Sequence, residues 1–122
     1  LILVTGGAAS GKSEHAERLV CEKAQSRLYL ATMQPFGKSA EARIARHRAL
    51  RAGKGFATVE RTLDLANLGS LGNTTEFLLE DLGNLLANEL FAPEGAGAGS
   101  AFDSIVAGVD NLQNTVNAGY RF

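Results

Sequence analysis

Apolar residues gather in short runs at several points along the chain. The first, Leu1 to Thr5, ends at a pair of glycines, which predicts a buried strand that turns into a loop. Arg27 to Ala31 is the next strand candidate, Phe56 to Arg61 is a short extended piece, and Thr75 to Leu79 is a β-prone run. The first two strands, joined by a helix, form a βαβ unit, so we expect them to lie parallel in one sheet.

Between and after these runs, apolar residues recur at helical spacing. The pattern begins at Ser13, and the segment Lys38 to Ala52 has no Gly or Pro and is rich in Ala and Arg. Leu82 to Phe91 also has the pattern of a helix. Pro93 and four glycines between positions 95 and 108 then interrupt it, and helical spacing returns from Phe102 to Val116.

Strands alternating with helices predict an α/β fold with three layers and a mostly parallel sheet, like that of P-loop NTPases. At 122 residues, 45% of them apolar, the chain has the size of one domain covering residues 1–122. The sequence ends where another strand is expected, so we expect the C-terminal part of the fold to be absent. It has no leader-like segment and no apolar run near about eighteen residues, which predicts a cytoplasmic protein without a membrane span.

The segment after the first predicted strand has the pattern of a phosphate-binding loop, Gly, four residues, Gly, Lys, Ser. Its members are Gly6, Gly7, Ala8, Ala9, Ser10, Gly11, Lys12 and Ser13. Glycines let backbone N–H groups surround a phosphate at the positive end of the following helix. Lys12 would reach the terminal phosphates, and the Ser13 hydroxyl would bind Mg²⁺. The alternative is a glycine-rich turn that binds nothing.

Acidic residues follow the apolar run that ends at Leu79. Glu80 and Asp81 have the position from which P-loop proteins hold Mg²⁺, directly or through water. Acids after strands are also common surface residues, so the pair alone leaves both interpretations open.

Charge is divided unevenly along the chain. Residues 1–61 hold 11 Lys and Arg against 5 Asp and Glu, whereas residues 62–122 hold 1 against 8. A basic half is compatible with nucleic acid, but aromatic residues are scarce in it and its charges cluster on one short stretch. A small polyphosphate ligand explains the charges more economically, so we expect no nucleic-acid partner.

Most of that charge lies on the predicted helix 38–52, where four Arg and one His fall between positions 43 and 51. Arg43 and Arg51 lie one helical turn on either side of His47. Arginine forks can hold phosphates, and a neutral imidazole beside a polyphosphate could attack phosphorus and carry a nucleotidyl group. The alternative is a solvated basic helix with an incidental histidine. His15 has the weaker case and is expected at the surface.

These segments together resemble the bifunctional adenosylcobinamide kinase / adenosylcobinamide-phosphate guanylyltransferase family. The resemblance rests on ordered blocks over residues 1 to about 91: Leu3-Val4-Thr5 with the phosphate loop, Glu14-His15-Ala16-Glu17, Tyr29-Leu30-Ala31-Thr32, Arg43-Ile44-Ala45-Arg46-His47-Arg48, Thr58-Val59-Glu60, Leu78-Leu79-Glu80-Asp81 and Asn88-Glu89-Leu90-Phe91. Some members carry two adjacent histidines where this chain has Arg46-His47. The family also continues beyond Phe122 with strands and a helix.

The resemblance implies phosphorylation of adenosylcobinamide, then transfer of GMP from GTP to that phosphate through a guanylylated histidine, in cobalamin biosynthesis. His47 would take the GMP, and Lys12 would act on the phosphates. The nucleotide site would comprise residues 6–13 with Ala31, Thr32, Met33, Arg48, Ala49, Leu50, Arg51, Glu60 and Glu80. Ser13 and Glu80 would hold Mg²⁺, GTP and ATP would be substrates, and the protein would be a homo-oligomer, with a trimer as the expected form.

Two other functions fit parts of the pattern. In a P-loop small-molecule kinase without nucleotidyl transfer, His47 would be inert and the arginine helix would clamp phosphate. In a nucleotide-dependent switch module, loop ordering would regulate partner binding without turnover. Covalent labelling of the protein from GTP would separate the first function from the family reaction.

Overall fold

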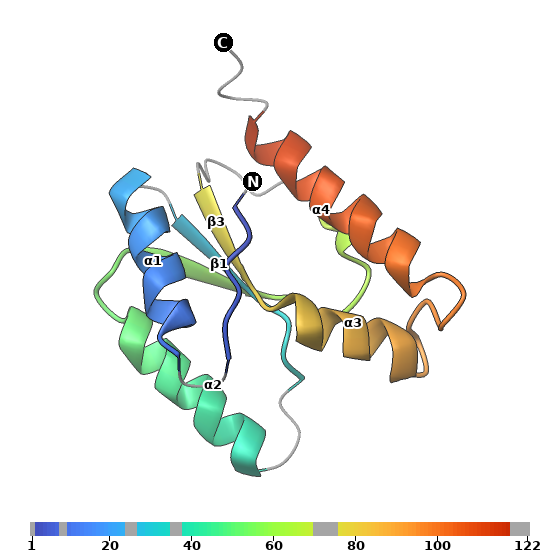
Figure 1. The fold of residues 1–122 in the computed structure, drawn as a ribbon, viewed down its shortest axis with the longest axis horizontal. Helices are drawn as coiled ribbons and strands as arrows, with labels where there is room; N and C mark the ends of the chain where they lie inside the picture. Colours follow the sequence, from blue (N-terminus) through green and yellow to red (C-terminus); the bar gives the residue numbers. More distant parts are fainter. Residues whose placement is uncertain (1, 8–9, 24–26, 35–37, 70–75, 118–122) are drawn as a thin grey trace.

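The chain folds into a small parallel sheet with helices on both of its faces (Figure 1). The structure is a computed structural model that describes residues 2–7, 10–23, 27–34, 38–69 and 76–117. Its elements are α1 (Lys12–Lys23), β1 (Arg27–Ala31), α2 (Lys38–Arg51), β2 (Phe56–Glu60), the 3₁₀ turn η1 (Leu65–Asn67), β3 (Glu76–Glu80), α3 (Leu82–Phe91) and α4 (Ala101–Asn117). The predicted α/β class and the helices and strands after residue 12 are confirmed. α2 and β2 each end one residue before the predicted bound, and β3 extends to Glu80.

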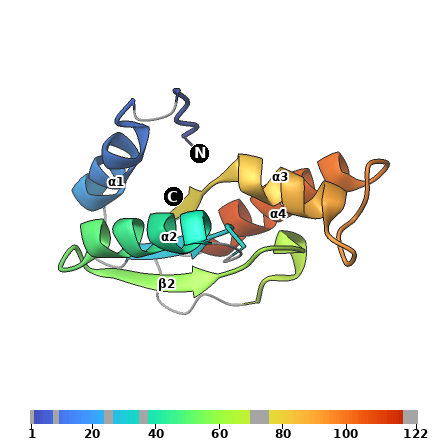
Figure 2. The same ribbon diagram turned by 90° about the horizontal axis from the view of Figure 1, so that it is seen from below.

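The three strands lie in the order β2-β1-β3, and both pairs are parallel. β1 is the central strand, and Leu28, Tyr29 and Leu30 are its buried residues. Because side chains alternate along a strand, Leu28 and Leu30 face one side of the sheet and Tyr29 faces the other. Figures 1 and 2 show α1 and α2 at one end of the molecule and α3 and α4 at the other.

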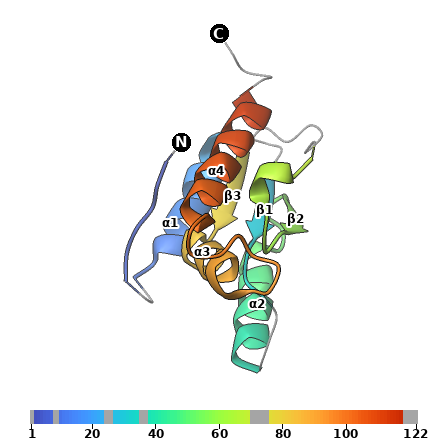
Figure 3. The same ribbon diagram turned by 90° about the vertical axis from the view of Figure 1, so that its right-hand side faces the viewer.

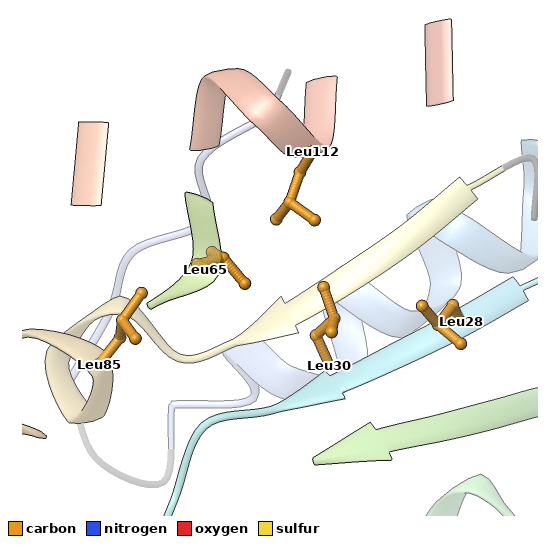
Figure 4. Close-up of a cluster of buried hydrophobic side chains, with 5 residues drawn as sticks. All are labelled: Leu28, Leu30, Leu65, Leu85 and Leu112. Carbon is orange, nitrogen blue, oxygen red and sulfur yellow. The ribbon is translucent and has the colours of Figure 1, made fainter. Parts of the chain in front are cut away.

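The hydrophobic core lies on the Leu28 and Leu30 side of the sheet. These two leucines pack with Leu65 of η1, Leu85 of α3 and Leu112 of α4 (Figure 4). Leu30 and Leu85 are fully buried. Five leucines from four separate elements therefore join the sheet to its covering helices through apolar burial.

Polar groups hold the layer that covers this core. The Asn111 side chain of α4 donates hydrogen bonds to the backbone carbonyls of Leu65 and Leu68, each at 3.2 Å. Figure 3 shows η1 beside α4. The Glu89 carboxylate, only 3% exposed, accepts bonds from the N–H groups of Asp64 and Ala96 and from the Ser104 hydroxyl. This buried charge is stabilised by three donors from three different segments.

Leu1 lies outside the described residues. For the rest of the segment from Leu1 to Thr5, the predicted strand is wrong. Residues 2–7 have no regular secondary structure, and Ile2 and Leu3 are 56% and 71% exposed. Among the described residues the sheet contains β2, β1 and β3 alone, so residues 2–7 pair with none of its strands. The expected placement of this segment and Arg27–Ala31 as parallel strands of one sheet is therefore not found, and β1 lies between β2 and β3.

In the part of the chain that the structure describes, no helix is both long enough and apolar enough to cross a membrane.

Gly108 is a position where α4 packs tightly against η1. A Cβ at this position would lie 2.7 Å from the Leu65 Cβ, which has little freedom to move. We expect Gly108→Ala to lower the free energy of unfolding by about 1–2 kcal/mol, because overpacking outweighs the helix propensity of alanine. Denaturant unfolding measures this change.

The matched control is Gly83→Ala in α3, where the nearest atom to a new Cβ would be Asp81 Oδ1 at an ordinary 3.4 Å. This variant should be more stable than the parent by up to about 1 kcal/mol. A Gly108→Ala protein at least as stable as the parent would contradict the tight packing of α4 on η1.

Candidate functional site

The face of the sheet opposite the leucine core carries polar side chains in register. Glu60 and Glu80 are both paired with Ala31 at the carboxyl ends of the strands, and Tyr29 is paired with Thr58 two residues earlier. All five residues line one cleft of about 860 Å³. The strand pairing therefore brings two carboxylates and a phenol from three separate segments to the edge where parallel sheets bind ligands.

Glu80 is the meeting point of three elements in this cleft. Its carboxylate accepts hydrogen bonds from the Ser13 hydroxyl of α1 and the Tyr29 hydroxyl of β1. Nδ1 of His47, on α2, lies 3.6 Å from Glu80 Oε2. A single acid at the end of β3 thus links the first turn of the phosphate-loop helix to the predicted nucleophile.

Tyr29 is a donor in this arrangement. Burial, and after it the hydrogen bond to Glu80, raises the pKa of Tyr29 far above its ordinary value. The phenol therefore keeps its proton and continues to donate to the carboxylate at any physiological pH.

Arg51 is the most enclosed of the basic side chains on α2. It is 6% exposed, and its guanidinium carbon lies 3.3 Å from the centroid of the Tyr29 ring, a cation–π geometry. Its Nε and Nη1 atoms have no hydrogen-bond partner among the described residues, although the side chain lines the cleft. Buried N–H groups without acceptors are costly, so this guanidinium is suited to an anionic ligand.

The other arginines of α2 are solvated. Arg48 donates to Glu60 at 2.5 Å, but both side chains are more than half exposed, so the ion pair contributes little to stability. Arg43 and Arg46 are exposed and line the cleft. They give the cleft a positive rim that would attract a polyphosphate.

The phosphate-loop pattern leads directly into α1, which begins at Lys12. Gly11 has φ +85°, a conformation that favours glycine. A Cβ on Gly6 would lie 2.6 Å from Ser10 Oγ. Close contact therefore favours glycine at position 6, and backbone conformation favours it at position 11. The Lys12 ammonium donates to the Gly7 carbonyl at 3.3 Å, across the loop. Ala8 and Ala9 lie outside the described residues.

The cleft gathers most of the residues predicted as a nucleotide site. Those that line it are Ser10, Gly11, Lys12, Ser13, Ala31, Met33, His47, Arg48, Arg51, Glu60 and Glu80. Gly6, Gly7, Thr32 and Ala49 are not among the lining residues, and the side chain of Leu50 is not described. Thr32 is fully buried, where its hydroxyl bonds to the backbone N–H and carbonyl of Asp81.

Several lining residues were missed as site residues by the sequence reasoning, among them Tyr29, Thr58 and Asn84. Tyr29 and Thr58 have a signal in the two-residue period of their strands, but it becomes visible only when the strand pairing is known. Asp81 also lines the cleft, and its side chain accepts from the Asn84 N–H at 2.7 Å as the N-cap of α3. The acidic pair is therefore divided between a cleft carboxylate and a helix cap.

A phosphate-loop pattern that opens a helix, beside the carboxyl edge of a parallel sheet covered by helices, defines an α/β protein of the P-loop type. A family model described as cobinamide kinase / cobinamide phosphate guanyltransferase matches residues 2–118. The chain belongs to this family, and the resemblance inferred from the ordered sequence blocks is confirmed.

Curated relatives agree with this assignment. The chain is 42% identical over 93 residues to the bifunctional adenosylcobalamin biosynthesis protein CobU of Escherichia coli (strain K12). The matched region covers 75% of this chain and 50% of that protein. It is 41% identical over 97 residues to the protein of that name from Salmonella typhimurium, covering 78% and 52%. The chain thus spans about half the length of these relatives. No solved structure gave a significant match.

We expect Glu80 and Asp81 to have different roles, and the capping role of Asp81 can be tested on its own. Asp81→Ala should lower the free energy of unfolding by about 1 kcal/mol, because the N–H of Asn84 loses its acceptor. Asp81→Asn keeps an oxygen acceptor and should stay within a few tenths of a kcal/mol of the parent. Equal losses in the two variants, measured by denaturant unfolding, would contradict the capping role.

Proposed function

We propose that this protein phosphorylates adenosylcobinamide and then transfers GMP from GTP to adenosylcobinamide phosphate, giving adenosylcobinamide-GDP in cobalamin biosynthesis. Family membership supports the pair of reactions. The observation that carries the proposal is that His47, the buried Arg51 and the phosphate-loop residues Lys12 and Ser13 line the same cleft. One nucleotide site could then serve both reactions.

In the first reaction, the side-chain hydroxyl of adenosylcobinamide attacks the γ-phosphorus of a nucleoside triphosphate, ATP or GTP. A new O–P bond forms, the bond to the bridging oxygen breaks, and the nucleoside diphosphate leaves while the hydroxyl proton passes to water. Residues 6–13 would hold the phosphates through backbone N–H groups, and Lys12 would neutralise charge that develops on the terminal phosphate.

In the second reaction, His47 is the nucleophile. Its Nδ1 is buried without a hydrogen-bond partner among the described residues, and the Glu80 carboxylate lies 3.6 Å away. A small approach of the two groups would let Nδ1–H donate to this carboxylate, which would leave the lone pair on Nε2. Nε2 attacks the α-phosphorus of GTP, and the bond to pyrophosphate breaks. The proton stays on Nδ1, where the carboxylate offsets the positive charge of the phosphorylated imidazole.

The covalent intermediate then passes its GMP to the second substrate. A phosphate oxygen of adenosylcobinamide phosphate attacks the same phosphorus, the N–P bond breaks, and neutral His47 is restored. In the preceding step, Arg51 and Arg48 would hold the pyrophosphate that leaves GTP as the intermediate forms, with Ala49 and Leu50 on the same helix turn. Ala31, Thr32, Met33 and Glu60 would complete the nucleotide site, Thr32 through its backbone because its side chain is buried.

Mg²⁺ fits the residues at the base of the cleft. The Ser13 hydroxyl and the Glu80 carboxylate are hard oxygen donors that already contact each other. Magnesium needs only one or two protein ligands when phosphates and waters supply the others, and no cluster of three metal-binding side chains occurs in the described segments. When bound, the ion would neutralise phosphate charge. We further propose a single nucleotide-binding domain in a cytoplasmic homo-oligomer, with a trimer as the form to test.

His47 distinguishes this proposal from a simple kinase. We expect His47→Asn to abolish GMP transfer, with at least about a thousandfold loss, because the attacking nitrogen is removed, while phosphorylation of adenosylcobinamide persists. Incubation with GTP labelled at the α-phosphate, followed by peptide mapping under alkaline conditions, measures the transfer.

The matched control is His15→Asn, since His15 is the other histidine of the chain and is exposed on α1. This variant should label like the parent. Label found on His15 or on a lysine would show that His47 is not the nucleophile. An unlabelled parent protein that still phosphorylates adenosylcobinamide would support the kinase alternative.

Glu80→Gln tests the metal site, because it keeps the shape of the side chain and removes its charge. The Mg²⁺ concentration for half-maximal kinase activity should rise about tenfold. Glu60→Gln, at the equivalent register position on the other side of Ala31, should leave that concentration unchanged. The same Mg²⁺ requirement in Glu80→Gln as in the parent would remove Glu80 from the metal site.

A further inference from the structure

Tyr29 touches both charged groups that the proposed transfer depends on, yet no step described above uses it. It lies at the centre of β1, 4% exposed, on the cleft side of the sheet. Its hydroxyl donates to the Glu80 carboxylate, and its ring carries the Arg51 guanidinium. One side chain from the most enclosed strand therefore contacts an anion at its tip and a cation on its face.

The ring contact determines how Arg51 can meet a ligand. A guanidinium stacked on an aromatic face has its flat surface covered, while its N–H groups point outward in the plane. Nε and Nη1 of Arg51 have no acceptor within the described parts of the chain. The contact thus holds a buried cation over the ring, with two of its nitrogens left to donate to a phosphate.

The hydroxyl contact has the corresponding effect on Glu80. The carboxylate receives the Ser13 and Tyr29 hydroxyls, and its Oε2, the atom that Tyr29 contacts, is also the one nearest His47 Nδ1. Without the phenol, the carboxylate loses one of its two hydroxyl donors and can rotate away from the imidazole. His47 would then lose the nearby carboxylate that, in the proposed transfer, would accept from Nδ1 and orient the ring.

We propose that Tyr29 is a positioning residue for nucleotidyl transfer, which orients Glu80 with its hydroxyl and Arg51 with its ring. The inference rests on the proposed function. Tyr29 acts through these two side chains on the nucleophile and on the departing pyrophosphate. Its two contacts should therefore affect two different kinetic quantities.

Two substitutions separate the contacts. Tyr29→Phe removes the hydroxyl and keeps the ring, so the rate constant for labelling at saturating GTP should fall about tenfold. The GTP concentration that gives half of the maximal rate should stay within about twofold of that of the parent. Tyr29→Leu removes both contacts, so half-saturating GTP should also rise about tenfold. Single-turnover labelling with α-phosphate-labelled GTP measures both quantities.

Phe56→Leu is the matched control for lost aromatic packing. Phe56 packs edge-on against Tyr29, with ring centroids 6.4 Å apart, but it does not line the cleft. Its variant should label with parental rate constant and half-saturating GTP even if its Tm falls. Labelling of Tyr29→Phe at the parental rate would overturn the inference. Equal slowing in Tyr29→Phe and Phe56→Leu would also overturn it, because packing alone would then account for the effect.

Labelling of the parent protein distinguishes failure of the proposed transfer from failure of the positioning role. If the parent protein takes no label at His47, the proposed transfer itself fails. If the parent is labelled at His47 and the Tyr29 variants label like the parent, the transfer stands and the positioning role is wrong.

Discussion

The central strand β1 has two chemically different sides, and the rest of the structure is arranged around that difference. Leu28 and Leu30 enter the leucine core beneath α3 and α4, whereas Tyr29, between them, faces the cleft. Since a one-residue slip in register would exchange these sides, apolar burial of the two leucines also fixes where the phenol points. Stability on one face therefore specifies the chemistry on the other.

The charged side chains of the cleft differ in whether they have partners within the protein. Glu80 is satisfied by two hydroxyls, and the exposed Arg48 pairs with Glu60. Arg51 differs, because its ring contact leaves two N–H groups without acceptors among the described residues. A ligand phosphate would meet a cation that is already dehydrated and oriented, so little reorganisation would be needed on binding.

Local signals explain which parts of this structure could be predicted from the sequence. The helices over residues 38–51, 82–91 and 101–117 have strong periodicity or composition, and the phosphate loop has fixed positions with a physical role for each. Ile2 to Thr5 has the composition of a strand, but composition does not tell whether the segment pairs with a strand of the sheet. Thr32 and Tyr29 show the same limit, since strand pairing and tertiary contacts decide which of them is buried below the cleft and which enters it.

The buried Glu89 carboxylate has a consequence for how the covering layer moves. Its three donors belong to the start of η1, the connection after α3 and the first turn of α4, which are separated by up to forty residues in the chain. None of these segments can lift away alone without leaving a dehydrated negative charge short of a donor. The shared carboxylate therefore couples local opening of these three segments, so that the loss of one contact weakens the others.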